Sequence, residues 1–195
     1  MEINNFYTIT VYEKGSEVIR MIRTFIGADA FRTAMDVYFS RFDGQAVTTE
    51  DFVSVMEESS GMDLTQFKLW YAQGGTPTLT VTADHNAEDK TLALTVKQSV
   101  PTTAGPGQDN KLPMQMPLSI GFIGANGEMP TQLAGDDAAL DGTRVLNVCA
   151  AEQTFTFVNV DEKPALSLLR AFSAPVFLHY DAPDRDLLLL MSNDT

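Results

Sequence analysis

Tyr12 is a residue whose type and setting could serve catalysis. It lies in residues 11–15, Val-Tyr-Glu-Lys-Gly, at the start of a stretch whose apolar residues have helical spacing. A tyrosine hydroxyl can donate a hydrogen bond to an oxygen on which negative charge develops, which stabilises the transition state of carbonyl chemistry. A helical tyrosine can also be an amphipathic core residue with its hydroxyl at the edge of the layer. The elements around Tyr12 decide between these two roles.

The other reactive residues predict no metal site. The two histidines, His85 and His179, are far apart in sequence, and neither has a cysteine or carboxylate at zinc-ligand spacing. Cys149 ends an apolar run that is typical of a buried strand rather than of an electropositive pocket. A small hydrolase that uses Cys149 or a serine with His179 remains an alternative, but no base and orienting acid can be assigned to it. A nucleophile elbow, a phosphate loop and a dinucleotide fingerprint are absent.

The composition narrows the classes of partner. The chain has 195 residues, 26 of them acidic and 13 basic, so its formal net charge is -13. Nucleic acid and anionic membrane surfaces both need a basic patch, so the sequence predicts neither as a partner. No stretch approaches the roughly 20 apolar residues of a membrane span, and the N-terminus lacks the pattern of a signal peptide. With its single Cys149, the chain is expected in the cytoplasm.

Four short helices are predicted before residue 74. Apolar residues recur every three or four positions from Val11 to Ile26, and the same spacing appears in residues 30–42, 49–60 and 64–73. The predicted N-caps of the last three helices are Asp29, either Thr48 or Thr49, and Asp63, and the predicted stops after the first three are Gly27, Asp43-Gly44 and Gly61. Together these helices form a small helical layer.

The pattern changes from helical to alternating at residues 74–77, Gly-Gly-Thr-Pro. Strands are then expected at residues 78–82, 92–96, 118–123, 131–133, 145–149, 154–158, 166–172 and 176–180. Short strands at this spacing predict an immunoglobulin-like antiparallel β-sandwich, so the fold class is α+β. Residues 101–113 are expected to form a solvated loop, and a further helix is expected to start at Asp184.

Two motifs give the chain a resemblance to a known family. Residues 11–15 contain Tyr-x-Lys-Gly, and residues 70–77 contain Trp-x-x-Gln-x-Gly-x-Pro. Both resemble the M1 (gluzincin) zinc aminopeptidases, and residues 151–157 and 172–176 resemble its bacterial aminopeptidase N (alanyl aminopeptidase) branch. The resemblance implies the end of a thermolysin-like catalytic domain at residues 1–75, an immunoglobulin-like β-sandwich at 76–182, and the start of a truncated C-terminal helical domain at 183–195.

The resemblance also implies roles for individual residues. Tyr12 would stabilise the transition state, and Asn4, Asn5 and Tyr7 would line the substrate pocket, although either asparagine can be a turn or cap residue. Lys14 and its neighbour Glu13 are expected to be solvated or locally structural.

The family binds zinc through His-Glu-x-x-His and a later glutamate, and this chain lacks that motif. We therefore expect an internal fragment of a metallopeptidase that removes N-terminal amino acids from peptides. Zinc and peptide substrates would bind the full-length enzyme, in which this segment has the rest of the parent chain as its partner. The fragment would bind no zinc and be inactive alone. The alternative is a freestanding immunoglobulin-like interaction module with no catalytic role.

Overall fold

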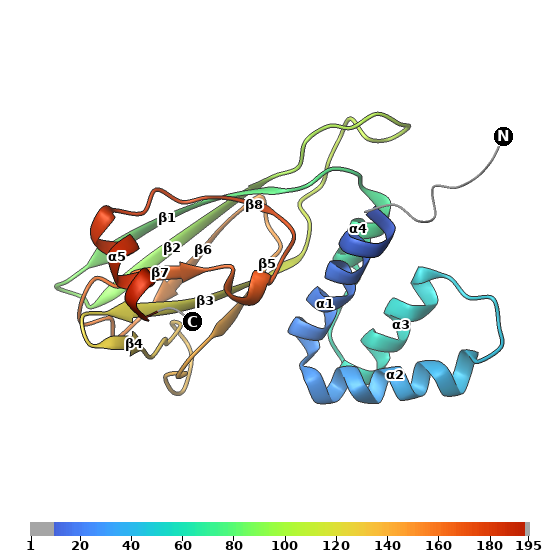
Figure 1. The fold of residues 1–195 in the computed structure, drawn as a ribbon, viewed down its shortest axis with the longest axis horizontal. Helices are drawn as coiled ribbons and strands as arrows, with labels where there is room; N and C mark the ends of the chain where they lie inside the picture. The colour runs from blue at the N-terminus through green and yellow to red at the C-terminus, as the bar shows by residue number, and fades with distance from the viewer. Residues whose placement is uncertain (1–9, 194–195) are drawn as a thin grey trace.

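The computed structural model describes residues 10–193, which form a helical layer at one end of two β-sheets (Figure 1). The chain enters through a π-helical turn, η2 (Thr10–Lys14), and continues directly into α1 (Gly15–Ile26). The two are one continuous helix, because Lys14 at the junction has helical dihedral angles, φ -66° and ψ -35°. Gly27 ends α1 with a positive φ of 83°, as predicted.

Helix α2 (Ala28–Phe42) begins earlier than expected. Asp29 is not its N-cap, because Gly27 occupies that position and makes no side-chain cap hydrogen bond. Gly27 alone separates α1 from α2, so no residue with a capping side chain lies between them. Helix α2 ends at Asp43, whose extended dihedral angles break the helix.

Helix α3 (Thr49–Ser60) has the N-cap that the sequence predicts. The Thr48 hydroxyl accepts a hydrogen bond from the Asp51 backbone N–H at 3.3 Å, and the Asp51 carboxylate accepts one from the Thr48 backbone N–H at 2.8 Å. This reciprocal pair is a capping box, and Gly61 ends the helix in the left-handed conformation.

We expect Thr48→Ala to lower the free energy of unfolding by about 1 kcal/mol at neutral pH. Hydrogen bonds from the Thr48 backbone and then its hydroxyl hold the pKa of Asp51 below its ordinary value. That stabilisation is present above the unfolded-state pKa and is lost as the pH falls through the folded-state pKa, so acid should reduce the effect of the variant. Urea unfolding at pH 7 and at acidic pH measures both effects. Thr33→Ala, on the exposed face of α2, is the control and should not destabilise the chain.

The fourth helical segment is shorter than predicted. It consists of a 3-10 turn, η3 (Gln66–Lys68), followed by one turn of α-helix, α4 (Leu69–Ala72). The N-cap of η3 is Thr65 rather than the predicted Asp63, although the Asp63 carboxylate accepts a hydrogen bond from the Thr65 backbone N–H at 2.9 Å. Trp70 and Phe67 are buried on this segment and anchor it to the rest of the core.

Two four-stranded sheets follow, which confirms the α+β class with an immunoglobulin-like sandwich. One sheet has the order β6-β2-β1-β8, and in the other β3 lies at the centre with β4, β5 and β7 paired to it. The strands of the first are β1 (Thr78–Asn86), β2 (Thr91–Ser99), β6 (Glu152–Phe157) and β8 (Phe177–His179). Those of the second are β3 (Met116–Gly124), β4 (Gly127–Met129), β5 (Arg144–Val148) and β7 (Ala165–Leu168). The pairing of β8 with β1 is parallel, whereas the other pairs are antiparallel among the strands described.

Two predicted strands differ from the structure. Residues 131–133 make only isolated bridges, from Thr131 to Leu140 and from Leu133 to Phe157. The strand expected at residues 166–172 ends at Leu168, and a 3-10 turn, η4 (Arg170–Phe172), follows with left-handed φ angles at Ala171 and Phe172. The guanidinium of Arg20 donates to the carbonyl oxygens of both residues, at 2.7 and 2.6 Å. A contact from α1 therefore stabilises a turn that local sequence does not predict.

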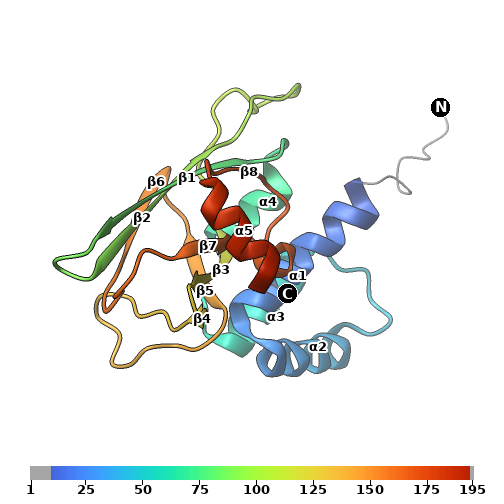
Figure 2. The same ribbon diagram turned by 60° about the vertical axis from the view of Figure 1, so that its left-hand side comes forward.

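The last helix, α5 (Asp184–Asn193), packs on β7 and β3 (Figure 2). Its acidic first turn fits the expected helix start. Asp186 is buried, whereas Leu188 and Met191 are exposed. Within residues 10–193, no helix has the length and apolar character needed to cross a bilayer.

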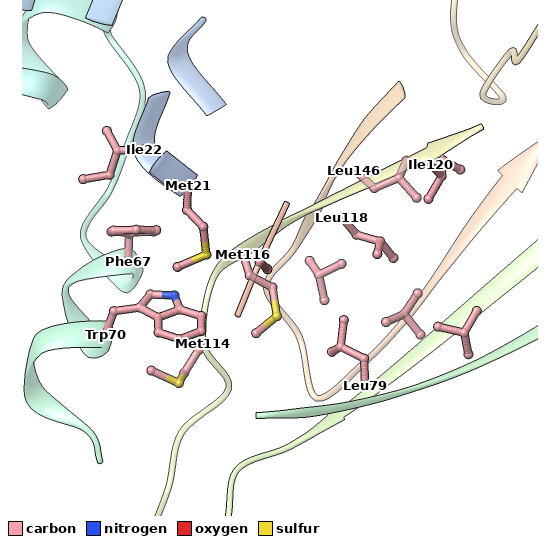
Figure 3. Packing of buried hydrophobic residues seen from close by; sticks show 14 of the residues in the cluster. Met21, Ile22, Phe67, Trp70, Leu79, Met114, Met116, Leu118, Ile120 and Leu146 are labelled. Carbon is pink, nitrogen blue, oxygen red and sulfur yellow. The ribbon is translucent and has the colours of Figure 1, made fainter. Parts of the chain in front are cut away.

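The buried apolar residues form one cluster that runs from the helical layer into the sandwich. Figure 3 shows the transition: Met21 and Ile22 of α1 lie beside Phe67 and Trp70, which lie beside Met114. The cluster continues to Met116, Leu118 and Ile120 of β3, Leu146 of β5 and Leu79 of β1. The helices therefore have a shared core with the sheets.

Candidate functional site

A groove lies beside Tyr12 in the described part of the chain. It has a volume of about 1150 Å³ and lies between the start of the first helix, the N-terminus of α3 and the connector from α4 to β1. Its wall is largely aromatic and aliphatic, with Val11, Ile19, Tyr38, Phe52 and Tyr71 among the lining residues. A groove of this size and character is typical of sites that bind peptides or small molecules.

Tyr12 lies on the π-helical turn η2 and lines this groove. Tyr12 is 57% exposed in this chain. The π-helix is rare, and where it appears as a single turn within an α-helix it is often at a functional site. The structure thus places Tyr12 at the wall of the groove.

Lys14 joins the two motifs that the sequence analysis singled out. Its ammonium donates a hydrogen bond to the Gly75 carbonyl oxygen at 2.8 Å and lies 5.7 Å from the centre of the Trp70 ring. Burial lowers the pKa of Lys14 below its ordinary value. The expectation of a solvated or locally structural Lys14 is wrong, because its ammonium is part-buried and its hydrogen bond links residues 61 positions apart.

The second motif connects the helical layer to the sandwich. The amide of Gln73 exchanges two hydrogen bonds with the backbone of Leu112, one from its Nε2 at 2.9 Å and one to its Oε1 at 2.7 Å. The indole N–H of Trp70 donates to the Gln115 carbonyl oxygen at 2.7 Å, just before β3. Gly75 has a φ of +95°, and a Cβ there would lie 3.2 Å from the Pro101 carbonyl oxygen. Glycine is therefore the residue that fits this turn.

Tyr71 is a further groove tyrosine that the sequence analysis did not select. Burial, and then the negative charge of Glu50, raise the pKa of Tyr71 above its ordinary value. It therefore remains a protonated hydrogen-bond donor at neutral pH. Its place in the second motif was a signal that could have identified it.

Neither Cys149 nor His179 lines the groove. Asn4, Asn5 and Tyr7 lie outside the described residues. Cys149 is half-buried after β5, where its backbone N–H donates to Gln153 at 3.1 Å, while His179 lies on β8 of the other sheet.

His85 forms a structural hydrogen bond, because its Nε2 lies 2.9 Å from the Val160 carbonyl oxygen. Across residues 10–193, no three His, Cys, Asp or Glu side chains come together in a way that could hold a metal ion. The structure thus brings only Tyr12, among the predicted site residues that it describes, to the groove.

Two protein families match this chain, one on each side of the connector. Residues 1–71 match the peptidase family M1 domain. Residues 75–181 match a domain of unknown function with an Ig-like fold, DUF3458. The observed sandwich agrees with the second description, and the groove lies within or next to the first match.

The relatives of the chain are aminopeptidases. It is 47% identical over 192 residues to aminopeptidase N of Escherichia coli (strain K12) and 43% identical over 191 residues to aminopeptidase N of Haemophilus influenzae. Each match covers 98% of this chain and 21% of the relative. A crystal structure of Legionella pneumophila aminopeptidase A in complex with aspartic acid superposes with a TM-score of 0.80 at 35% identity, covering 97% of this chain and 20% of that one.

The chain therefore spans about a fifth of the length of these relatives. Similarity extends over nearly all of its residues, through the helical layer and the sandwich alike. The resemblance predicted from the two motifs is thus confirmed. The chain belongs to the DUF3458 Ig-like family, and the helical segment that precedes this domain matches the peptidase family M1 domain, so that as a fragment it is similar to bacterial aminopeptidase N over nearly all of its residues.

Proposed function

We propose that this chain is part of a zinc-dependent aminopeptidase that removes N-terminal amino acids from peptides, and that Tyr12 stabilises the transition state. The observation that carries the proposal is the exposed position of Tyr12 on a π-helical turn at an apolar groove. The aminopeptidase activity named for the relatives supports it.

The chemistry of peptide hydrolysis explains why a tyrosine would serve there. Attack of water on the scissile carbonyl places negative charge on its oxygen, and a donor fixed near that oxygen lowers the barrier. A phenol donates through its O–H without carrying a charge of its own. Tyr12 is held on a helix rather than on a loop, so its hydroxyl can be pre-positioned. Asn4, Asn5 and Tyr7, which precede this turn in sequence, would contact the substrate.

The zinc ion implied by the family does not fit the described part of the chain. His85 lies against a backbone carbonyl oxygen, and no other groups of suitable type gather around it or around His179 among residues 10–193. A zinc ion would need its ligands from parts of the aminopeptidase that this sequence does not include. We therefore assign no step of the reaction to a metal bound by these residues, and the chain alone would be inactive.

The division of the chain follows the same proposal. Residues 1–75 would be the end of the catalytic domain, residues 76–182 the sandwich, and residues 183–195 the start of a C-terminal helical domain. The limits of the two family matches, 71, 75 and 181, support these boundaries. A cytoplasmic location is part of the proposal too, supported by the single Cys149 in the sequence.

The test compares the isolated chain with a full-length M1 aminopeptidase that carries this sequence. We expect the isolated chain neither to hydrolyse aminoacyl substrates nor to bind zinc stoichiometrically, because a catalytic zinc needs three protein ligands. The full-length protein should hydrolyse them in a chelator-sensitive reaction. One tightly bound zinc per isolated chain, with chelator-sensitive turnover, would overturn the proposal. Absence of turnover in the full-length protein would favour an interaction module.

A further inference from the structure

The ammonium of Lys14 makes two contacts within the chain that are unusual for a surface lysine. Lysine side chains are mostly solvated, yet this one is half-buried and its ammonium contacts a backbone carbonyl oxygen and an aromatic face. Partial burial of a cation costs free energy unless such partners compensate for the lost water. The contact closes the turn of η2 onto the connector that follows α4.

Both partners of Lys14 are themselves held in place. Trp70 is only 6% exposed, and its indole N–H is bound to the Gln115 carbonyl oxygen. Gly75 lies against Pro101 in a backbone conformation that few other residues adopt. The two partners of the Lys14 ammonium, Trp70 and Gly75, are therefore fixed by contacts with the β-sandwich and the loop before it.

Lys14 lies close to Tyr12 along the helix. Tyr12 and Lys14 belong to the same π-helical turn, and both line the groove. Residues two positions apart do not face each other on a helix, so Lys14 can act on Tyr12 only through the backbone of that turn. Fixing the rotation of the turn fixes the direction in which the Tyr12 ring points. The first turn of an isolated helix would otherwise fray.

We infer that Lys14 is a positioning residue for Tyr12: it clamps the π-helical turn to Gly75 and Trp70 so that the Tyr12 hydroxyl is held at the groove. The inference rests on the proposed function, in which that hydroxyl contacts the reacting carbonyl oxygen. The inferred contact also explains how the motifs at residues 11–15 and 70–77 act together. The first supplies the donor and the clamp, and the second supplies the surface that the clamp binds.

The experiment uses a full-length M1 aminopeptidase that carries this sequence. Lys14→Met keeps an apolar stem of similar length but removes the cation and its N–H donors, and it should lower kcat by about 10-fold to 100-fold with little change in KM. Lys14→Arg retains both features and should restore much of the lost kcat. Lys97→Met removes an exposed lysine of β2 and should leave kcat unchanged.

A double-mutant cycle separates positioning from a general loss of stability. If Lys14 acts through Tyr12, then Lys14→Met should cause little further loss of kcat in a Tyr12→Phe enzyme. An equal fold-loss in both backgrounds would overturn the inference, as would an unchanged kcat in Lys14→Met. Should that variant fail to fold, Lys14→Leu, which also removes the cation and its N–H donors, decides by the same two criteria.

The outcome also distinguishes this inference from the proposed function. If Tyr12→Phe itself leaves kcat unchanged, the proposed function fails and the inference fails with it. If Tyr12→Phe lowers kcat but the Lys14 variants do not, only the positioning role fails. Trp70 is the single tryptophan of the chain, so its fluorescence in the isolated chain reports directly whether the Lys14 contact has been lost.

Discussion

Tyr12→Phe, introduced into a full-length M1 aminopeptidase carrying this sequence, is expected to lower kcat by about 10²- to 10³-fold, the usual cost of losing one oxyanion donor. The substitution removes only the hydroxyl and keeps the ring, so packing and folding should be nearly unaffected. KM should change little, because the hydrogen bond is proposed to strengthen as charge develops on the oxygen. Steady-state kinetics on an aminoacyl substrate measures both constants.

Tyr180→Phe is the matched control for this experiment. Tyr180 follows β8, is half-buried, and does not line the groove, so the loss of its hydroxyl should leave kcat unchanged. If Tyr12→Phe also left kcat unchanged, Tyr12 would have no part in the chemistry. A large rise in KM with kcat unaltered would instead make it a substrate-binding residue.

Phe67→Ala is expected to lower the free energy of unfolding by about 3–5 kcal/mol. Phe67 is fully buried on η3 and packs edge-to-face on Phe25, with a centroid distance of 6.3 Å. A loss of this size is a large part of the roughly 5–15 kcal/mol that holds a typical domain folded. Because the apolar cluster continues from Phe67 into the sandwich, helical and β signals should be lost together.

Urea unfolding, followed by circular dichroism and Trp70 fluorescence, provides the measurement. Phe39→Ala is the control, since that side chain is 58% exposed on α2 and its removal should change stability by no more than about 0.5 kcal/mol. Two well-separated transitions in the Phe67 variant, or a loss no larger than that of the control, would contradict the view of a shared core.

Features of the fold that depend on neighbouring residues were predictable from the sequence. Gly27 and Gly61 end helices because a positive φ is needed there, and Thr48 with Asp51 forms a capping box within one turn. The turn at η4 was not predictable. It depends on Arg20, which is about 150 positions away and binds two of its carbonyl oxygens. Long-range contacts of this kind leave no local pattern.

The candidate site was predictable to a lesser extent. Tyr12 was identified through its motif, because a single tyrosine on a helix has no spacing that distinguishes a donor from a core residue. The groove was not predictable, since its walls come from three separated parts of the helical layer. The contact of Lys14 with Gly75 was not predictable either, although the two motifs that it joins had both been recognised.

The measurement that tests the central claim most directly is the affinity of a tetrahedral transition-state analogue for the Tyr12→Phe enzyme. If Tyr12 donates to the developing oxyanion, its removal should weaken binding of the analogue by about the same factor by which kcat/KM falls, while KM stays nearly constant. An inhibition constant that remains at the wild-type value despite a fall in kcat/KM would contradict the claim. Tyr12 would then act at another step or on the structure of the groove.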